Sequence, residues 1–139
     1  PDALAALERI AARLPVAAVT NGNADLQRIG LGHLFVHQVH SREHGVAKPE
    51  PALFHVACDL LGVPPGDVLH VGDHIEMDIV GAVNAGLRSC WINRPEDHDG
   101  TARAWPHDTL RPDLEFATLT ALADWLDAHP DFATEPAAA

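Results

Sequence analysis

The sequence predicts an α/β fold in which a parallel sheet lies between two layers of helices. Three observations predict it. Strand-like and helix-like segments alternate along the chain, the strand-like segments Val16–Val19 and Val68–Val71 are mostly continuous apolar runs, and small polar turn residues follow each of them. Continuous apolar runs are typical of strands that are buried on both faces. Their alternation with helices favours a parallel arrangement of the strands.

The first part of the chain predicts a helix, a strand, a turn and a second helix. Asp2–Arg13 has alanine and leucine at helical spacing behind an acidic first residue, and Pro15 ends this pattern. Val16–Val19 is the first strand. Thr20–Asn23 ends it with small polar turn residues, and Ala24–Ile29 resumes a helical pattern.

A second strand is expected at Phe35–His40, before a loop that ends at Lys48-Pro49-Glu50-Pro51. Proline is tolerated in the first turn of a helix, and Ala52–Leu61 carries apolar residues at core-facing helical spacing. Gly62 is placed to cap the end of this helix.

The stretch Val68–Gly81 predicts a strand, a tight turn at Gly72 and a helix that runs to Gly86. Two carboxylates follow the strand, at Asp73 and Asp78. Ligands of parallel α/β sheets bind outside the carboxyl ends of the strands, which is where Asp73 would lie. Mg²⁺ prefers oxygen ligands and usually takes one or two protein carboxylates, with water and substrate phosphate completing its shell. This turn is therefore a candidate metal site.

The remaining segments complete one domain. The core is expected to span residues 1–129, and the tail, residues 130–139, is expected to be flexible. The segments after the acidic turn are a strand, a polar loop, a short strand and a helix: Arg88–Asn93, Arg94–Pro112, Leu114–Phe116 and Ala117–His129.

Composition excludes several classes of function. The chain has 139 residues, 47% of them hydrophobic, as expected of one soluble domain. A formal net charge of -11 argues against binding nucleic acid or an anionic membrane, because too few basic residues are available to neutralise phosphates. The chain has no apolar run long enough to span a membrane.

The two cysteines indicate where in the cell the protein is located, and the first residue indicates whether the chain is part of a longer polypeptide. Cys58 and Cys90 fit neither a disulfide framework nor a zinc spacing, so we expect buried small side chains in a cytoplasmic protein. The chain begins at Pro1 and its only methionine is Met77. We therefore expect it to be part of a longer polypeptide.

Polar groups at three strand ends and loops are expected to converge at one edge of the sheet. Thr20, Lys48, Asp73 and Asp78 supply a hydroxyl, an ammonium and two carboxylates, a set that suits a phosphate with its metal. Lys48 can neutralise charge on phosphate oxygens and Asp73 can hold Mg²⁺. Asp78 could order metal-bound water or orient Lys48.

Phosphate would also be bound by the turn after the first strand. Thr20 and the backbone amides at Asn21 and Gly22 can donate to phosphate oxygens. Lys48 is the only lysine in the chain, and a compact point charge suits a crowded site beside a metal. A solvated cation on a loop is the alternative for Lys48, and composition alone does not exclude it.

Histidines near these segments carry weaker signals. His33, His37, His40 and His44 are spaced 4, 3 and 4 residues apart, which on a helix would make one face. That segment has a strand pattern, so solvent-facing side chains are favoured over a metal site. His70 and His74 flank the acidic turn, where a packed or hydrogen-bonded role is favoured over catalysis.

The ordered motifs resemble a known family. Thr20-Asn21-Gly22 after a strand, Lys48-Pro49-x-Pro51, the segment from Val71 to Asp78 with its Gly-Asp pair, and the glycine and alanine pattern from Gly81 to Gly86 are similar to motifs II, III and IV of the haloacid dehalogenase (HAD) superfamily. The resemblance covers roughly Pro1–Pro95 and is closest to small-cap members that act mainly as Mg²⁺-dependent phosphatases.

This resemblance implies a three-layer Rossmann-like sheet and a role for each matching residue. Thr20 would bind phosphate, and Lys48 would bridge phosphate and nucleophile. Asp73 would ligate Mg²⁺ and Asp78 would support the site. The implied activity of the intact protein is hydrolysis of a small phosphorylated metabolite through an aspartyl-phosphate.

The chain departs from the family in one respect. No Asp-x-Asp follows an apolar run, and Asp97-His98-Asp99 lies in a polar loop on the wrong side of the motif order. The family's nucleophile strand and substrate-selecting cap are therefore expected to be missing, and this chain alone is expected to be inactive. In the family that strand lies between the strands ending at Thr20 and Asp73. Those two strands are expected to pair with each other or with another molecule, or to stay open.

The sequence leaves two other interpretations of the function open. One is a catalytically inactive, truncated HAD-like domain that serves as a binding or scaffold module. The other is a metal-independent 2-haloacid dehalogenase. True haloacid dehalogenases lack the glycine-aspartate pair found here at Gly72-Asp73, so the resemblance favours the phosphatase branch.

Overall fold

The six strands that the computed structural model describes lie in one parallel sheet. The structure describes residues 2–20, 34–40, 45, 48, 50–94, 104–129 and 137–138. The strand order is β2-β1-β6-β3-β4-β5, and every pair is parallel. The strands are β1 (Val16–Thr20), β2 (His37–His40), β3 (Leu69–Gly72), β4 (Arg88–Ile92), β5 (Leu114–Phe116) and β6 (Ala137–Ala138). The predicted α/β class is confirmed.

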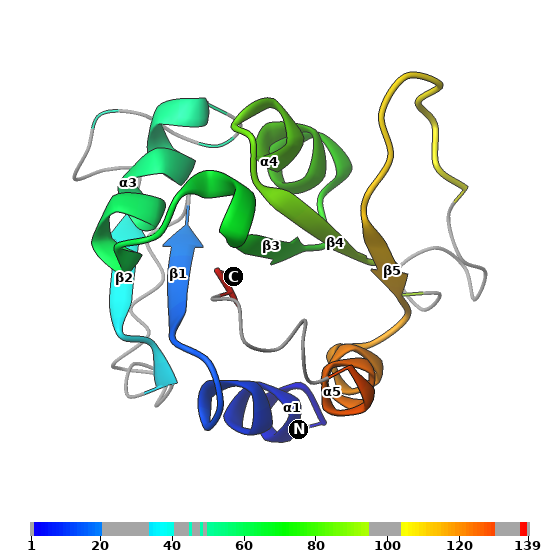
Figure 1. Ribbon diagram of the computed structural model, residues 1–139. Coiled ribbons are helices and arrows are strands. Elements are labelled where there is room, and N and C mark those ends of the chain that lie inside the picture. The colour runs from blue at the N-terminus through cyan, green and yellow to red at the C-terminus, as the bar shows by residue number, and fades with distance from the viewer. Residues whose placement is uncertain are drawn as a thin grey trace.

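Helices cover both faces of this sheet, which gives the three predicted layers (Figure 1). One layer contains α1 and α5, and the other contains α3 and α4. Their bounds are α1 (Asp2–Ala11), α3 (Pro51–Leu61), α4 (Gly81–Asn84) and α5 (Leu119–Ala128), with a short 3₁₀ turn η2 (Pro65–Asp67) before β3. The helix predicted at Ala24–Ile29 lies outside the described residues.

The strand pattern divides the core between the two layers. All four residues from Val16 to Val19 are at most 4% exposed, as expected of a strand covered on both faces. Alternate residues of β3 point in opposite directions: Leu69 packs with α1 and α5, whereas His70 contacts Phe54 of α3. Cys58 and Cys90 are buried and unbridged, as predicted.

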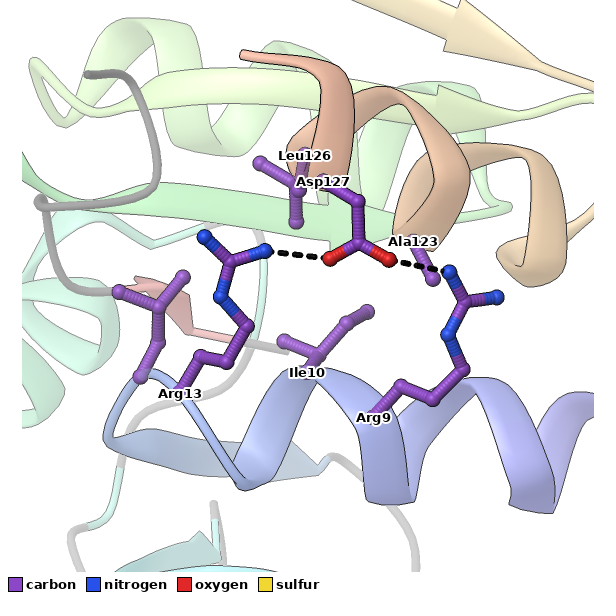
Figure 2. Close-up of a pocket in the computed structure, with 7 residues that line it drawn as sticks. Arg9, Ile10, Arg13, Ala123, Leu126 and Asp127 are labelled. Atoms are coloured by element: carbon purple, nitrogen blue, oxygen red, sulfur yellow. Dashed lines mark hydrogen bonds and ion pairs between the residues drawn. The ribbon is translucent and has the colours of Figure 1, made fainter. Parts of the chain in front are cut away.

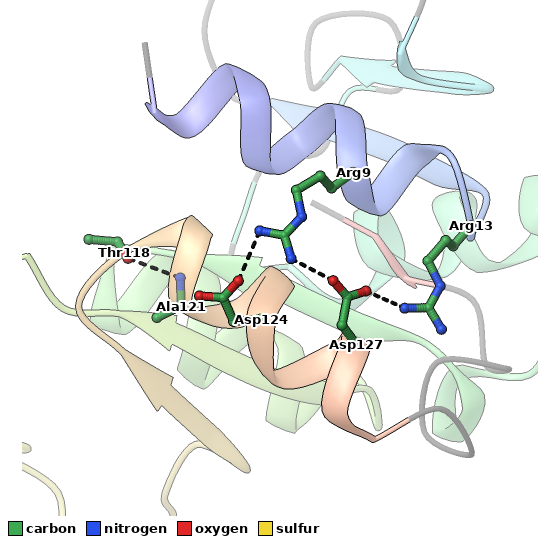
Figure 3. Close-up of polar contacts among 6 residues, drawn as sticks. All are labelled: Arg9, Arg13, Thr118, Ala121, Asp124 and Asp127. Carbon is green, nitrogen blue, oxygen red and sulfur yellow. Dashed lines mark hydrogen bonds and ion pairs between the residues drawn. The ribbon is translucent and has the colours of Figure 1, made fainter.

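Polar contacts join α1 to α5 at the surface of their layer. Arg9 donates to Asp124 over 2.9 Å and to Asp127 over 2.5 Å, and Arg13 also donates to Asp127 (Figure 3). A small pocket lies beneath these ion pairs, with Ile10 among the apolar residues that line it (Figure 2). The side chains involved are exposed, so these contacts add little to stability compared with the apolar contacts below them.

α5 begins later than its helical pattern indicates. The pattern predicts a start at Ala117, but Thr118 adopts an extended conformation and its hydroxyl accepts from the backbone of Ala121 (Figure 3). This is an N-cap, so the first helical residue is Leu119.

The two central strands are separated by a strand of the same chain. β6 pairs with β1 through Val16 and Ala17, and with β3 through Leu69 and His70. The expectation that β1 and β3 would pair with each other or with another molecule, or stay open, is therefore wrong. Flexibility of the tail stays a prediction for residues 130–136 and 139, which lie outside the described residues, but Ala137–Ala138 form a strand.

The helix after β3 differs from the continuous helix predicted up to Gly86. Its first part is a π-helix, η3 (Ile75–Val80), and α4 follows it directly. The backbone amide of Ile79 donates to the carbonyl of His74 five residues earlier, which widens the turn. Single π turns inside helices frequently occur at functional sites. Among the described residues, no helix is long and apolar enough to cross a membrane.

Candidate active site

The acidic turn after β3 is built on a close approach of two residues. Asp78, on η3, folds back over Gly72 at the end of β3. A β-carbon placed on Gly72 would lie 2.4 Å from the Asp78 Cγ, far inside contact distance. Only glycine leaves room for this carboxylate.

Three donors hold the Asp78 carboxylate. Oδ1 accepts from the Lys48 Nζ over 2.7 Å and lies 3.0 Å from the His70 Nε2. Oδ2 accepts from the backbone amide of His74 over 3.2 Å. Asp78 is only 5% exposed, and these hydrogen bonds replace those that water would make.

The same contacts decide the charge of Asp78. Burial by itself raises the pKa of this carboxyl. The hydrogen bond from His70 and the nearby Lys48 ammonium outweigh burial and hold the pKa well below its ordinary value. Asp78 is therefore an ionised carboxylate at neutral pH.

Lys48 is drawn into the site rather than extended into solvent. Its side chain is 15% exposed and ends against Asp78. The interpretation of Lys48 as a solvated loop cation is therefore excluded. Of the two roles suggested for Asp78, contact with Lys48 is the one that the geometry supports.

Asp73 lies at the open side of the same turn. Its carboxylate is 60% exposed, and Oδ2 lies 3.8 Å from the Arg94 Nη1 just beyond β4. Its backbone carbonyl accepts from the indole nitrogen of Trp91 over 3.3 Å. Trp91 is 1% exposed, so the backbone of the turn is tied to the core while the carboxylate faces outward.

The donor chemistry of Asp73 fits one ligand of Mg²⁺. An exposed carboxylate at a strand end offers the hard oxygen that this ion prefers, and Mg²⁺ needs only one or two such protein ligands. Asp78 is occupied by its three donors and is less suited to the metal. The part of the chain that the structure describes contains no group of three or more potential metal-binding side chains.

Several other predicted site residues are only partly described or lie outside the described residues. Thr20 is the last residue of β1 and pairs with His40, but its side chain is not described. Asn21, Gly22, His33, His44 and Asp97-His98-Asp99 lie outside the described residues. His37 and His40 lie on β2, which confirms the strand predicted there, and both side chains are partly exposed.

Sequence reasoning did not assign three neighbours of the acidic turn to the site. Arg94 and Trp91 come from β4 and the residues after it, and no local motif marks them. His70 was predicted to be packed or hydrogen-bonded, and it is both, but its partner was not predicted. The feature of the sequence that could have marked His70 as a site residue is that it is the one polar residue in the apolar run Val68–Val71.

Comparison with known proteins supports the arrangement described above. A family model described as "haloacid dehalogenase-like hydrolase" matches residues 1–86. The chain belongs to the haloacid dehalogenase-like hydrolases. The motif resemblance is thus confirmed.

Two relatives of the chain are named as a phosphatase and a nucleotidase. The 5-amino-6-(5-phospho-D-ribitylamino)uracil phosphatase YigB of Escherichia coli (strain K12) is 39% identical over 116 residues, which is 84% of this chain and 48% of that protein. The pyrimidine 5'-nucleotidase YjjG of the same organism is 38% identical, over 79% of this chain and 52% of its own length. The chain spans about half the length of these curated relatives.

Solved structures of this family share the fold. The 2-haloacid dehalogenase from Pseudomonas syringae pv. Tomato DC3000 superposes with a TM-score of 0.81 and 35% identity, covering 93% of this chain and 53% of that one. A HAD phosphatase from Thermococcus onnurineus superposes with a TM-score of 0.73 and 30% identity, and the match covers 91% of this chain and 57% of that protein.

Proposed function

We propose that this chain supplies the phosphate- and metal-binding half of a phosphatase that acts on a small phosphorylated metabolite. The observation that carries the proposal is the partly buried Lys48–Asp78 pair at 2.7 Å, together with the exposed Asp73 carboxylate in the turn that precedes Asp78. An ammonium fixed by one carboxylate, beside a second carboxylate free to face a ligand, suits a dianionic phosphoryl group. The phosphatase names of the relatives support this reading.

Each residue has one role in this proposal. Lys48 binds a phosphoryl oxygen and neutralises the charge that grows on it, and Asp78 keeps the ammonium in place. Thr20 and the amides of Asn21 and Gly22 donate to the remaining phosphoryl oxygens. Asp73 holds Mg²⁺, which when bound polarises the phosphoryl group and offsets its negative charge.

The nucleophile is a carboxylate outside this chain, on a segment that the longer polypeptide carries. It attacks phosphorus while the phosphorus–oxygen bond to the alcohol breaks and the departing oxygen takes a proton from an acid that also lies outside this chain. Water then attacks the aspartyl-phosphate, which releases phosphate and restores the carboxylate. The unbridged Cys58 and Cys90 support a cytoplasmic location for this enzyme. We propose neither a nucleic-acid nor a membrane partner, since the net charge is -11.

Hydrolysis of p-nitrophenyl phosphate with Mg²⁺ tests the proposal in two preparations. The 139-residue chain should show no turnover, whereas a longer polypeptide that includes an upstream Asp-x-Asp strand should be active. In the longer polypeptide Lys48→Ala should abolish activity, with His55→Leu, which removes an exposed histidine bonded to the Ala85 carbonyl, as the control. Turnover by the short chain, or near-normal rates after Lys48→Ala, would contradict the assignment.

A 2-haloacid dehalogenase is the second candidate, favoured by the likeness to the enzyme from Pseudomonas syringae. Release of chloride from 2-haloacids by the longer polypeptide, unaffected by EDTA, would support this candidate instead. Absence of both activities in a preparation that contains the upstream Asp-x-Asp would favour the inactive scaffold module.

A further inference from the structure

His70 is a buried polar side chain to which the proposed function gives no role. It is the second residue of β3, is fully buried, and packs edge-on against the ring of Phe54 at 4.9 Å. Its Nε2 lies 3.0 Å from the Asp78 Oδ1, the same oxygen that accepts from Lys48. A histidine in the centre of a sheet that reaches the main carboxylate of the site requires an explanation.

The direction of this hydrogen bond follows from the charge of its partner. Asp78 is ionised and can only accept, so the His70 Nε2 must carry the proton and donate. The other ring nitrogen, Nδ1, is buried and has no hydrogen-bond partner among the described residues. A proton there would add a buried charge and an unpaired donor, which is costly. The geometry therefore favours the tautomer that carries its proton on Nε2 and leaves Nδ1 bare.

His70 differs from the other two donors in where it comes from. Lys48 reaches Asp78 from a turn between β2 and α3, and the amide of His74 belongs to the turn that precedes η3. His70 belongs to β3, which is paired on both sides. It is thus the only donor, among those recorded in the described part of the chain, that fixes Asp78 to the sheet.

We propose that His70 is a positioning residue that, through its Nε2 proton, fixes the Asp78 carboxylate so that the carboxylate directs the Lys48 ammonium toward the phosphoryl site. The inference rests on the proposed function for its catalytic consequence, although the hydrogen-bonded chain itself can be tested without turnover. Without this donor, Asp78 keeps contacts only to turn segments and Lys48 loses its fixed direction.

The first experiment determines which ring nitrogen of His70 carries the proton. Long-range proton–nitrogen NMR of the 139-residue chain should show His70 with a protonated Nε2 and a bare Nδ1. A tautomer with the proton on Nδ1 would overturn the proposal, because Nε2 would then be unable to donate to Asp78.

The second experiment uses the only lysine of the chain as a probe. With ¹⁵N-lysine labelling, Lys48 gives one ammonium signal, and its protons should exchange slowly with water while they are held by Asp78. His70→Gln keeps a donor of similar reach and should retain the signal, and His70→Leu should lose it while remaining folded. His55→Leu, which removes an exposed histidine bonded to the Ala85 carbonyl, is the control. Slow exchange in folded His70→Leu would overturn the proposal.

The third experiment separates the two proposals. In the longer polypeptide His70→Leu should lower kcat on the order of ten- to a hundred-fold with little change in KM, and His70→Gln should recover most of it. Equal losses in both variants would overturn the positioning role. If the unmodified longer polypeptide is inactive, the proposed function fails, while the two NMR measurements still decide whether His70 positions Lys48.

Discussion

Asp78 and Gly72 are in contact so close that no other residue type fits at Gly72: a β-carbon there would lie 2.4 Å from the Asp78 Cγ. Among the described glycines, the left-handed backbone occurs at Gly45, Gly62 and Gly86. Gly72 is therefore required by the space that the Asp78 carboxylate occupies and not by the backbone conformation of the turn. The position of the site's central carboxylate thus depends on a residue with no side chain.

The first prediction is that Gly72→Ala displaces Asp78. The added methyl must push the carboxylate away from its donors, and such overpacking costs about 1–3 kcal/mol. Urea denaturation measures the loss. Gly66→Ala is the matched control, because nothing lies within 4 Å of the added carbon and its backbone is not left-handed. Equal stability of the two variants would contradict the predicted clash.

The second prediction concerns metal binding by Asp73. Asp73→Asn should weaken binding of Mn²⁺, used as a paramagnetic substitute for Mg²⁺, on the order of tenfold or more, equivalent to about 1.4 kcal/mol. Broadening of backbone NMR signals near the acidic turn measures the affinity. Glu76→Gln removes a neighbouring carboxylate that is 2.6 Å from the His107 ring and should leave the affinity unchanged. Unaltered broadening in Asp73→Asn would remove Asp73 from the metal site.

The third prediction is a pH dependence that originates at Asp78. Because the pKa of Asp78 is lower in the folded chain than in the unfolded one, its ionised form stabilises the fold above the unfolded-state value of about 3.9. That contribution is lost as the pH falls from there toward the lower folded pKa. At pH 7 Asp78→Asn should therefore cost about 3 kcal/mol, since it removes the carboxylate that accepts a hydrogen bond from the partly buried Lys48 ammonium.

Urea denaturation at pH 7 and pH 3 tests this prediction. The difference between the parent chain and Asp78→Asn should shrink in acid. Asp67→Asn, which removes an exposed carboxylate before β3, is the control at both pH values. A difference that stays constant or grows in acid would show that Asp78 is not held ionised by its neighbours.

The fourth prediction is that Cys90 is unreactive in the folded chain. Burial raises the pKa of its thiol to about 12, so the nucleophilic thiolate is scarce at pH 8 and the sulfur is also covered. In a Cys58→Ala background, Ellman's reagent should label Cys90 only when the chain opens or is denatured in urea. Rapid labelling of the native chain would mean that the helices α1 and α5 do not shield Cys90 on β4 from the reagent.

The sequence predicted the strands and helices where local patterns are strong. The prediction failed where the conformation of a segment depends on contact with residues elsewhere in the chain. Apolar runs placed β1 and β3 to within a residue of their observed bounds. The π-helix was missed because it arises where Asp78 folds back over Gly72, a contact that helical spacing does not encode. β6 was missed because two alanines in a tail rich in alanine carry no strand signal.

In the candidate site, too, residues that belong to local motifs were predicted and residues that arrive from a neighbouring strand were not. Lys48, Asp73 and Asp78 were found from residue type and order, and the structure brings Lys48 onto Asp78. Their assignment as site residues stays a proposal. Arg94 and Trp91 reach the turn across the sheet, so only the paired register of β3 and β4 could have revealed them.

The place of β6 has a consequence for how the chain is made. Synthesis runs from the N-terminus, so β1 and β2, and later β3, β4 and β5, emerge before the strand that lies between them. Until Ala137–Ala138 arrive, the nascent sheet consists of two pieces, each with an open edge toward the other. Joining them requires pairing between residues far apart in the sequence, which is slow. Within these 139 residues, the facing edges of β1 and β3 are therefore the last strand edges of the sheet to be paired.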